Sequence, residues 1–373
     1  MRIPPPTEIY QRLEELGYRG QEEARQAVCL VAYRHVKRLY HISSGKIARE
    51  LLPPRPNSIL IGPTGCGKTH LIELLFGKIL NLPYVIVEMT RFSETGYIGD
   101  NVLNILTRLM EAAGGKRELA ETGVVAMDEF DKLASSGSNI RFAGQGTTKD
   151  VSGYGVQREL LKMLDGSDVQ FSLDYGFSSK GEQQMMSTRD VTFFGLGTFS
   201  GFKSLDSAEP SVGFSAHKSG LESKGRRTDG IAYRVNQQEA DDIGRFQTCG
   251  FIPELIGRFT RIIPFQPLDT VTLRSILMRK VEEHKREFQE EGFDLRFDAS
   301  VRDMIVQEAF DRQTGARGLE SAIVKSLETF GFKHFGQGTT GGVVTMREKD
   351  GQIVSEVRLQ EHAQCVANNA GVV

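Results

Sequence analysis

The feature that most constrains this chain is a glycine-rich octapeptide between two regular segments. Residues Gly62 to Thr69 read Gly-Pro-Thr-Gly-Cys-Gly-Lys-Thr and fit the pattern G-x-x-x-x-G-K-[ST]. Such a loop wraps backbone N–H groups around phosphate oxygens, and side chains at its glycines would block that approach. The apolar segment Ser58–Ile61 predicts a strand before the loop, and residues Lys68–Leu80 predict a helix after it. A helix there points the positive end of its dipole at the phosphates.

The residue types of the loop predict individual roles in binding a nucleoside triphosphate. Lys68 supplies positive charge to the β- and γ-phosphate oxygens, and Thr69 offers its hydroxyl to Mg²⁺. We assign nucleotide binding to Gly62, Pro63, Thr64, Gly65, Cys66, Gly67, Lys68 and Thr69.

A second motif lies one predicted strand further along. The apolar run Val124–Met127 ends in two carboxylates, Asp128 and Glu129. Two acids at a strand end most often belong to a solvated loop, but downstream of a phosphate-binding loop they complete an ATPase site. Asp128 is then expected to hold Mg²⁺, and Glu129 to polarise the attacking water. The second acid favours hydrolysis over simple nucleotide-dependent switching.

The order of predicted elements indicates an α/β fold, because strands alternate with helices up to about Pro267. This alternation predicts a mostly parallel sheet with both faces covered. Four strands are expected, at Ser58–Ile61, Tyr84–Glu88, Val124–Met127 and Val191–Leu196. Beyond Pro267 the sequence predicts long helices at Val271–Glu291, Val301–Arg312 and Gly318–His334, and then a hairpin at Val343–Leu359.

Composition excludes several classes of protein. The 373 residues carry 46 basic and 48 acidic side chains, so no general positive field points to nucleic acid. No run approaches the roughly 18 apolar residues of a membrane span, and the N-terminus lacks a signal-peptide apolar region. We therefore expect a cytoplasmic protein that binds neither nucleic acid nor membrane.

The four cysteines also limit the possible chemistry. Cys29, Cys66, Cys249 and Cys365 are far apart and form no C-x-x-C pair. This spacing excludes a zinc site of the paired-cysteine kind, so no zinc is expected. Free thiols in a reducing compartment are the expected state.

Several segments resemble one family, the ClpX unfoldases of the AAA+ class. Gly20–Ala24 resembles the box beside the adenine, Glu94–Gly99 the pore loop shared with HslU, and Asp128–Lys132 the second ATPase motif. Lys149–Gln157 resembles the stretch after that motif, Ile252–Arg258 the arginine-finger segment, and Gly315–Leu319 sensor 2. They follow the family order over nearly the whole chain, from about residue 4 to residue 335.

This resemblance implies a fold and a machine. The fold is an AAA+ P-loop large domain with a mostly parallel sheet, plus a smaller C-terminal helical domain, with ATP between them. We expect the large domain at 1–266, the small domain at 267–348, and a strand with a flexible tail at 349–373. The implied machine is a homo-hexamer that uses ATP and Mg²⁺ to pull protein substrates through a central pore and deliver them to a ClpP-like peptidase.

The resemblance also assigns roles outside the phosphate loop. Arg258 is expected to act as an arginine finger on the γ-phosphate of a neighbouring subunit, and Arg317 as sensor 2. Thr198, at the end of a predicted strand, stands where a sensor-1 polar group would be. In the pore loop, Tyr97 and Ile98 are expected to grip substrate. The tripeptide Val212, Gly213 and Phe214 resembles the one with which ClpX docks on its peptidase.

Some stretches depart from the ClpX pattern. The chain starts directly at the ATPase region, without the N-terminal zinc-binding domain of ClpX. The segment Asp174–Thr188 has a lone Lys180 where ClpX carries a basic Arg-Lys-His loop, which puts substrate-tag preference in question. HslU is the nearest alternative within the superfamily, but the interval from Lys132 to Thr192 is too short and too rich in glycine for its inserted domain.

Four functions remain open on the sequence. The first is an unfoldase that delivers substrate to a peptidase, and the second is a remodeller of protein complexes that docks no peptidase. A clamp-loader-like assembly switch is less favoured, because it needs no aromatic pore residue such as Tyr97. A P-loop metabolic kinase has no use for Arg258 and Arg317 together.

Overall fold

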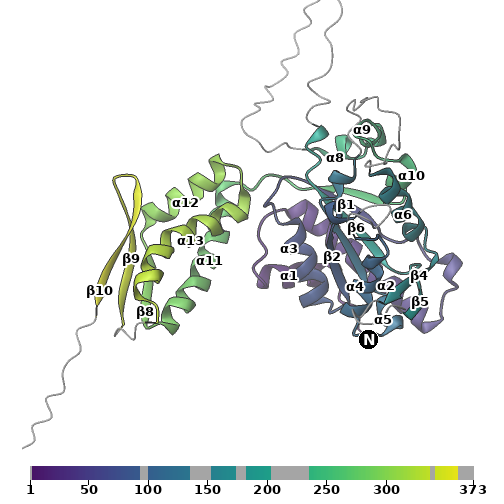
Figure 1. Ribbon diagram of the computed structural model, residues 1–373, viewed down its shortest axis with the longest axis horizontal. Coiled ribbons are helices and arrows are strands. Elements are labelled where there is room, and N and C mark those ends of the chain that lie inside the picture. Colours follow the sequence, from purple (N-terminus) through teal and green to yellow (C-terminus); the bar gives the residue numbers. More distant parts are fainter. Residues whose placement is uncertain are drawn as a thin grey trace, which may run out of the picture. The chain divides into compact units, whose positions relative to one another are not determined.

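The computed structural model describes residues 2–92, 100–134, 153–173, 182–202, 235–336 and 341–359. The chain divides into two compact units, Met1–Pro267 and Leu268–Val373, which are coloured along the sequence in Figure 1. No helix in the described ranges is long and apolar enough to cross a membrane.

The first unit is built on a parallel sheet with the strand order β2-β3-β6-β1-β7. The predicted α/β fold class and its four strands are confirmed, and the fifth strand, β7, was not predicted because it is short and ends in a proline. The strands are β1 (Ser58–Ile61), β2 (Tyr84–Glu88), β3 (Val124–Asp128), β6 (Thr192–Gly197) and β7 (Arg261–Pro264).

Two hydrophobic clusters cover the two faces of this sheet. Side chains alternate along each strand, so Leu60 and Phe194 pack on one face while Ile59 and Phe193 pack on the other. Every residue of β1 and β6 is buried, as expected for central strands of a sheet covered on both sides. The first face is covered by α1 (Pro6–Glu15), α2 (Glu22–Ser44), α3 (Lys68–Ile72) and its π-helical continuation η2 (Glu73–Ile79).

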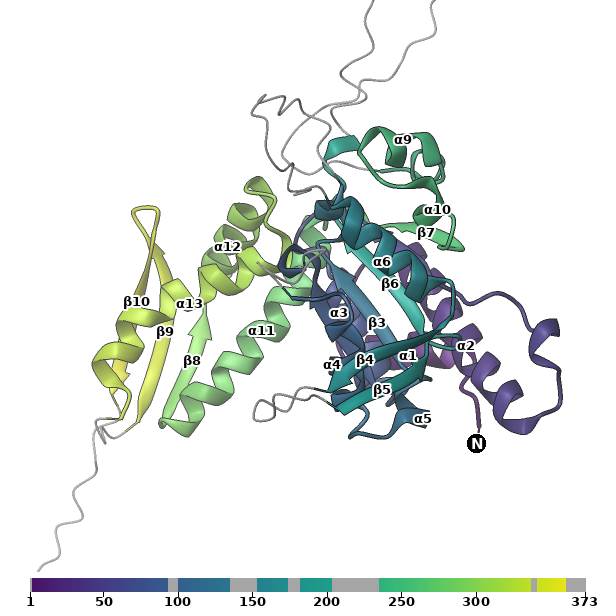
Figure 2. The ribbon, with the colours of Figure 1, turned by 45° about the vertical axis from the view of Figure 1, so that its right-hand side comes forward.

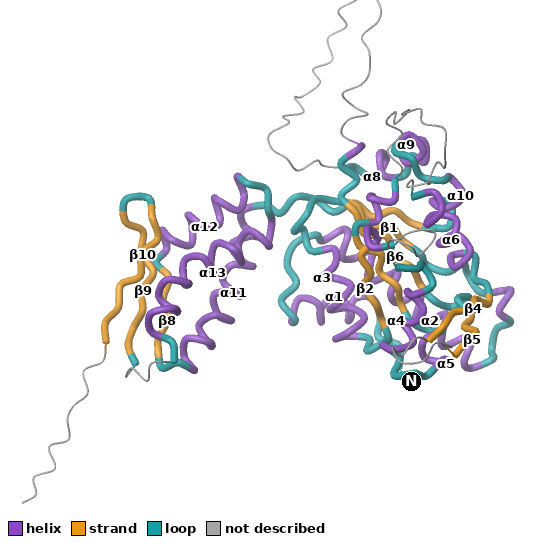
Figure 3. Tube along the Cα trace, in the orientation of Figure 1, coloured by secondary structure: helices purple, strands orange, loops and turns teal. Residues whose placement is uncertain are grey.

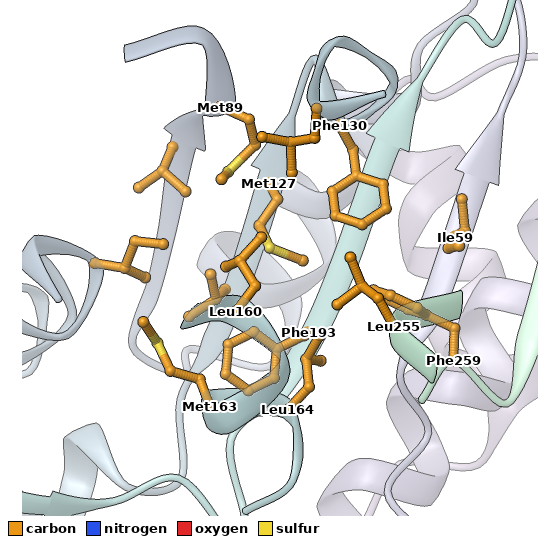
Figure 4. Close-up of a cluster of buried hydrophobic side chains, with 14 of the residues drawn as sticks. Ile59, Met89, Met127, Phe130, Leu160, Met163, Leu164, Phe193, Leu255 and Phe259 are labelled. Carbon is orange, nitrogen blue, oxygen red and sulfur yellow. The ribbon is translucent and has the colours of Figure 1, made fainter. Parts of the chain in front are cut away.

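The opposite face is covered by helices from later in the chain. Figure 4 shows Met127 of β3 and Phe193 of β6 lying together with Leu160 and Met163 of α6. The elements on this side and around it are η1 (Arg49–Leu51), η3 (Met89–Arg91), α4 (Asn104–Ala112), α5 (Arg117–Ala120), η4 (Phe130–Leu133), α6 (Tyr154–Leu164), α8 (Gln237–Ala240), α9 (Ile243–Thr248) and α10 (Pro253–Ile256). Figure 2 shows the sheet between the two groups of helices.

A separate antiparallel pair, β4 (Asp168–Leu173) and β5 (Glu182–Ser187), follows α6. The sequence did not predict it, because its strands are rich in polar residues such as Gln170 and Gln183. Only a few side chains anchor it, among them Phe171 and Met186, which are buried. The pair is visible in Figure 3 as two short orange strands.

The second unit packs three helices against a small sheet of order β10-β9-β8. The predicted hairpin is present, with an antiparallel register through Asp350 and Gly351, both at positive φ. The strand β8, parallel to β9, was not predicted. The elements are α11 (Thr270–Glu290), β8 (Phe293–Phe297), α12 (Ala299–Asp311), α13 (Gly315–His334), β9 (Gly342–Lys349) and β10 (Gln352–Leu359).

Aromatic packing holds this second unit together. Phe288 of α11 stacks on Phe330 of α13 with ring centroids 5.5 Å apart, and Phe293 of β8 meets Phe330 edge-on at 5.1 Å. All three rings are almost fully buried. Such aromatic contacts add stabilisation beyond the burial of their surface, so the unit has a core of its own.

A buried histidine makes the first unit sensitive to acid. The ring of His35 on α2 lies fully buried, with Nε2 3.1 Å from the Thr122 carbonyl oxygen and Nδ1 2.8 Å from the Thr192 hydroxyl. The carbonyl requires a proton on Nε2, so Nδ1 accepts from the hydroxyl in the neutral ring. Burial lowers the pKa of His35 to about 4.

Stability should therefore fall as the pH drops below the ordinary histidine pKa. The unfolded chain takes up a proton below about pH 6.5, whereas the folded chain does so only near pH 4, so the folded state loses about 2 kcal/mol between pH 7 and pH 5. Urea unfolding of wild type and His35→Gln at both pH values measures this loss of folding stability. An equal pH dependence in wild type and His35→Gln would contradict the account.

Candidate nucleotide site

The phosphate loop leaves the carboxyl end of β1 and enters α3 at Lys68. Gly65 and Gly67 have φ values of 75° and 99°, a region that side chains make costly. A Cβ on Gly62 would lie 2.5 Å from the carbonyl oxygen of Phe265. The glycines are therefore required both for the turn and for close packing of the loop against β7 and its continuation.

Lys68 occupies the centre of the loop. Its side chain is buried, and its ammonium group donates to the carbonyl oxygens of Gly62 at 2.6 Å and Pro63 at 2.9 Å. No carboxylate among the described residues pairs with it. A buried cation without a counter-ion is costly, so the loop is suited to receive an anion.

Cys66 lies within the loop beside this ammonium, with its Sγ 3.7 Å from the Lys68 nitrogen. Burial raises the pKa of the Cys66 thiol, and the charge of Lys68 opposes that shift only in part. The thiol is therefore protonated at neutral pH and acts as a small packing group rather than as a nucleophile.

The acidic residues at the end of β3 meet the start of α3. The Thr69 hydroxyl donates to Asp128 Oδ2 at 2.9 Å, and Asp128 Oδ1 accepts from the backbone N–H of Glu129 at 2.9 Å. Glu129 itself adopts a left-handed conformation with φ 54°, and its side chain is exposed. The fold thus brings the hydroxyl and carboxylate oxygens that suit Mg²⁺ to one place.

The end of β6 joins the same region. Gly62 donates its N–H to the Gly197 carbonyl at 3.1 Å, so the next residue, Thr198, follows directly beside the phosphate loop. Its hydroxyl and backbone N–H donate to the two carboxylate oxygens of Asp131 at 2.9 and 3.2 Å. Asp131 therefore links Thr198 to the segment that carries Glu129.

The segment between α1 and α2 packs against the loop from the other side. The Tyr18 hydroxyl donates to the Gly67 carbonyl at 3.3 Å, and its ring stacks on His70 with centroids 6.2 Å apart. Gln21 has φ 56° and forms two hydrogen bonds to the backbone of Gln266, at 2.5 and 2.9 Å. These two hydrogen bonds fix the chain at Gln266, just before the second unit begins.

Arg258 lies elsewhere in the first unit. Its carbonyl accepts from the side chain of Asn57 at 3.2 Å, and Asn57 immediately precedes β1. The phosphate loop follows the opposite, carboxyl end of that strand. From Asn57 to Gly62 a strand covers about 16 Å, which is longer than an arginine side chain. Within one protomer, Arg258 and the phosphate loop are therefore separated by the length of β1.

Arg317 belongs to the first turn of α13 in the second unit, where Gly315 has φ 59°. Its side chain is exposed and has no ion-pair partner among the described residues. It lines a hollow of about 600 Å³ in the second unit that also contains Arg312 and Lys325. The lining also includes Glu308, whose carboxylate pairs with Arg312 at 3.0 Å, so the net positive charge that suits an anion comes from Arg317 and Lys325.

Some predicted site residues lie outside the described ranges. They are Tyr97 and Ile98, in residues 93–99, and Val212, Gly213 and Phe214, in residues 203–234. The predicted loop Ser135–Thr148 also lies outside them.

Several positioning contacts had no signal in the sequence. Gln157 of α6 is fully buried, and its side chain bonds the carbonyls of Leu133 and Gly250 and the N–H of Ile252. It thereby joins the segment after Glu129 to the segment before Arg258. In the sequence Gln157 belongs only to a resemblance, because its role depends on partners 24 to 95 residues away.

Comparison with protein-family models gives two matches. Residues 54–262 match an AAA domain of the Cdc48 subfamily. Residues 268–341 match the C-terminal, D2-small domain of ClpB protein. The first match spans the sheet as far as the start of β7 but not α1 and α2, and the second spans α11, β8, α12 and α13 of the second unit.

Comparison with curated proteins gives extensive similarity to ClpX. The chain is 33% identical over 335 residues to the ATP-dependent Clp protease ATP-binding subunit ClpX of Azotobacter vinelandii, an alignment that covers 87% of this chain and 72% of that protein. It is 35% identical over 338 residues to ClpX 3 of Methylococcus capsulatus, covering 86% and 74%. It is 32% identical over 333 residues to ClpX of Treponema denticola, covering 87% and 76%.

The packing of Tyr18 on the loop predicts how Gly67 tolerates change. A Cβ at Gly67 would lie 2.9 Å from the Tyr18 hydroxyl, whereas a Cβ at Gly45, also at positive φ, meets nothing within 4 Å. Gly45→Ala should therefore cost about 1–2 kcal/mol of stability from the backbone alone. Gly67→Ala should cost about 1–3 kcal/mol more from overpacking.

Thermal or urea unfolding of the two variants measures this difference. Adding Tyr18→Phe removes the nearest atom and should recover part of the Gly67→Ala loss. Equal stability of Gly67→Ala and Gly45→Ala would show that Tyr18 does not constrain the loop.

Proposed function

The chain belongs to the ClpX family of AAA+ ATPases, and from this premise we propose that it is an ATP-dependent unfoldase that threads protein substrates through the pore of a homo-hexamer. The relatives' names identify them as ATP-binding subunits of the Clp protease. By analogy, we propose that unfolded substrate passes into a ClpP-like peptidase.

The residues around the phosphate loop supply the ATPase chemistry in this proposal. Lys68 leaves the loop carbonyls to contact the β- and γ-phosphates, since these offer it the counter-charge that its burial lacks. Glu129 orients and polarises the attacking water. Thr69 and Asp128 would hold Mg²⁺, which neutralises phosphate charge when bound with the nucleotide. Thr198, fixed by Asp131, is placed to sense the γ-phosphate.

The observation that carries the proposal of a ring is the position of Arg258. Because the length of β1 separates Arg258 from the phosphate loop of its own protomer, its guanidinium can serve only the site of another protomer. An arginine finger of this kind stabilises the charge that develops in the transition state. The ATPase site is then complete only in an assembly of several copies.

The remaining predicted residues take their roles from the family. We propose that the large domain spans 1–266 and the small domain 267–348, that 349–373 adds a strand and tail, and that Arg317 of the small domain contacts phosphate. Tyr97 and Ile98 grip the substrate in the pore. Val212, Gly213 and Phe214 dock the ring on its peptidase, where several weak contacts add through avidity.

The second candidate function is a remodeller that takes complexes apart and docks no peptidase. It uses the same ATPase site and the same pore residue, and differs only in the role of the segment around Phe214. The observation that favours the peptidase partner is the apolar pair Val212 and Phe214 in a largely polar stretch of sequence, since apolar groups mark a partner site where they are exposed.

The proposal predicts separable losses in three variants. Lys68→Ala should bind no ATP and unfold nothing. Tyr97→Ala should hydrolyse ATP near the wild-type rate but fail to unfold a stable fluorescent protein with a long unstructured tail, because pulling needs a bulky side chain. Phe214→Ala should unfold this substrate normally yet fail to degrade it when a ClpP-like peptidase is added. Loss of fluorescence and release of peptides measure the two steps.

Each outcome decides a different part of the proposal. Vigorous ATP hydrolysis by the wild type without any unfolding would contradict the unfoldase. Equal unfolding by Tyr97→Ala and wild type would remove Tyr97 from the pore. Loss of ATPase activity or solubility in Phe214→Ala would mean that the Phe214 side chain is part of the core, and would favour the remodeller.

A further inference from the structure

Asp165 is the only residue that pairs with the guanidinium of Arg258 among the described parts of the chain. Its Oδ1 lies 2.6 Å from Arg258 Nε. Asp165 follows α6 directly, whereas Arg258 follows α10. The two side chains meet at a hollow of about 500 Å³, and they are 43% and 51% exposed.

The closest atoms of this ion pair are the Arg258 Nε and the Asp165 Oδ1. Arginine presents its donors as a planar fork, and a carboxylate on Nε occupies one edge of that plane. The two Nη groups have no partner among the described residues, so they stay available to a second anion. A carboxylate placed in this way orients the side chain without occupying the groups that would bind phosphate.

The backbone of Asp165 is held firmly on both sides. Its N–H donates to the Leu161 carbonyl at 2.9 Å, and the N–H of Gly166 donates to the Met163 carbonyl at 3.2 Å. Arg55 donates to the carbonyl of Leu164, and also to that of Thr188 at 2.8 Å. The carboxylate therefore extends from a fixed point rather than from a free loop.

The backbone of Arg258 is equally fixed. Asn57 is 2% exposed, and its side chain joins the Arg258 carbonyl at 3.2 Å to the N–H of Phe193 at 3.0 Å. The next contact along the chain is from Thr260, whose N–H and hydroxyl both donate to the Asn57 carbonyl at 2.9 Å. The backbone of Arg258 is thus held next to the start of β1 and to β6.

The surroundings make a defined orientation necessary. The same hollow is lined by further cations, namely Arg38, Arg49, Arg55 and Arg189. Arg38 and Arg49 share Asp190 at 3.4 and 2.6 Å, and Arg189 lies 3.4 Å from Asp168. Each of these arginines has its own acid or carbonyl partners, and repulsion among them would otherwise displace an unpaired Arg258.

We propose that Asp165 is a positioning residue for Arg258, which holds the guanidinium by Nε so that its Nη groups face the phosphates of a neighbouring protomer. This inference rests on the proposed role of Arg258 in trans. An exposed ion pair contributes little to folding stability, so the value of this pair lies in the orientation it imposes. A correctly placed group avoids the entropy cost of finding its geometry in the transition state.

The test is the steady-state ATPase activity of assembled rings. Asp165→Asn should lower kcat between about 10-fold and about 100-fold, the scale of a misplaced catalytic group, with the KM for ATP nearly unchanged. Asp165→Glu keeps the carboxylate and should recover most of the activity. Asp168→Asn removes a nearby acid that pairs with Arg189 instead, and should retain wild-type kcat.

A double variant separates positioning from a merely structural role. In the Arg258→Ala background, adding Asp165→Asn should cause no further loss, because the group that Asp165 orients is absent. Wild-type kcat in Asp165→Asn rings, or a further loss in the double variant, would overturn the inference. So would failure of Asp165→Asn to form rings, or a melting temperature well below that of wild type. If Arg258→Ala rings kept wild-type turnover, the assignment of Arg258 itself would fail, and this inference with it.

Discussion

The placement of β1 between β6 and β7 is the constraint on which the site depends. All four residues of this strand are buried, and parallel pairing on both sides fixes its direction and register. The phosphate loop therefore begins at one edge of the sheet, and the anchor of Arg258 lies at the other. Loops at the carboxyl ends of parallel strands are where α/β sheets bind ligands, and Lys68, Thr69, Asp128 and Thr198 all come from that edge.

In the proposed function, this geometry leaves one protomer with an incomplete ATPase site. A phosphate loop with a buried, unpaired ammonium group is suited to an anion, and in the proposed function the acids beside it hold the metal and polarise the water. Arg258, the cation proposed to stabilise the transition state, is anchored a strand length away and pairs with Asp165. Hydrolysis can then be coupled to contacts between protomers, as a machine that moves substrate through a ring requires.

The sequence allowed the phosphate loop, the acids after β3 and the alternation of strands and helices to be predicted, because local patterns determine them. It did not predict β7, β8 or the β4–β5 pair, whose strands are short or polar and form only through partners far away in the chain. For the same reason, the contacts of Asp131, Asn57 and Asp165 could not be predicted. Their partners lie 67, 201 and 93 residues away, and no periodicity connects such positions.

The claim that the ATPase site is divided between protomers is tested most directly by mixing two inactive variants. Arg258→Ala keeps its own phosphate loop and acids, whereas Glu129→Gln keeps its arginine. Rings that contain both should regain part of the wild-type phosphate release, because an intact Arg258 then faces an intact Glu129. Each variant alone should remain nearly inactive, since an arginine finger contributes roughly 10³–10⁵-fold to the rate. Absence of recovery in rings shown to contain both variants would contradict the account.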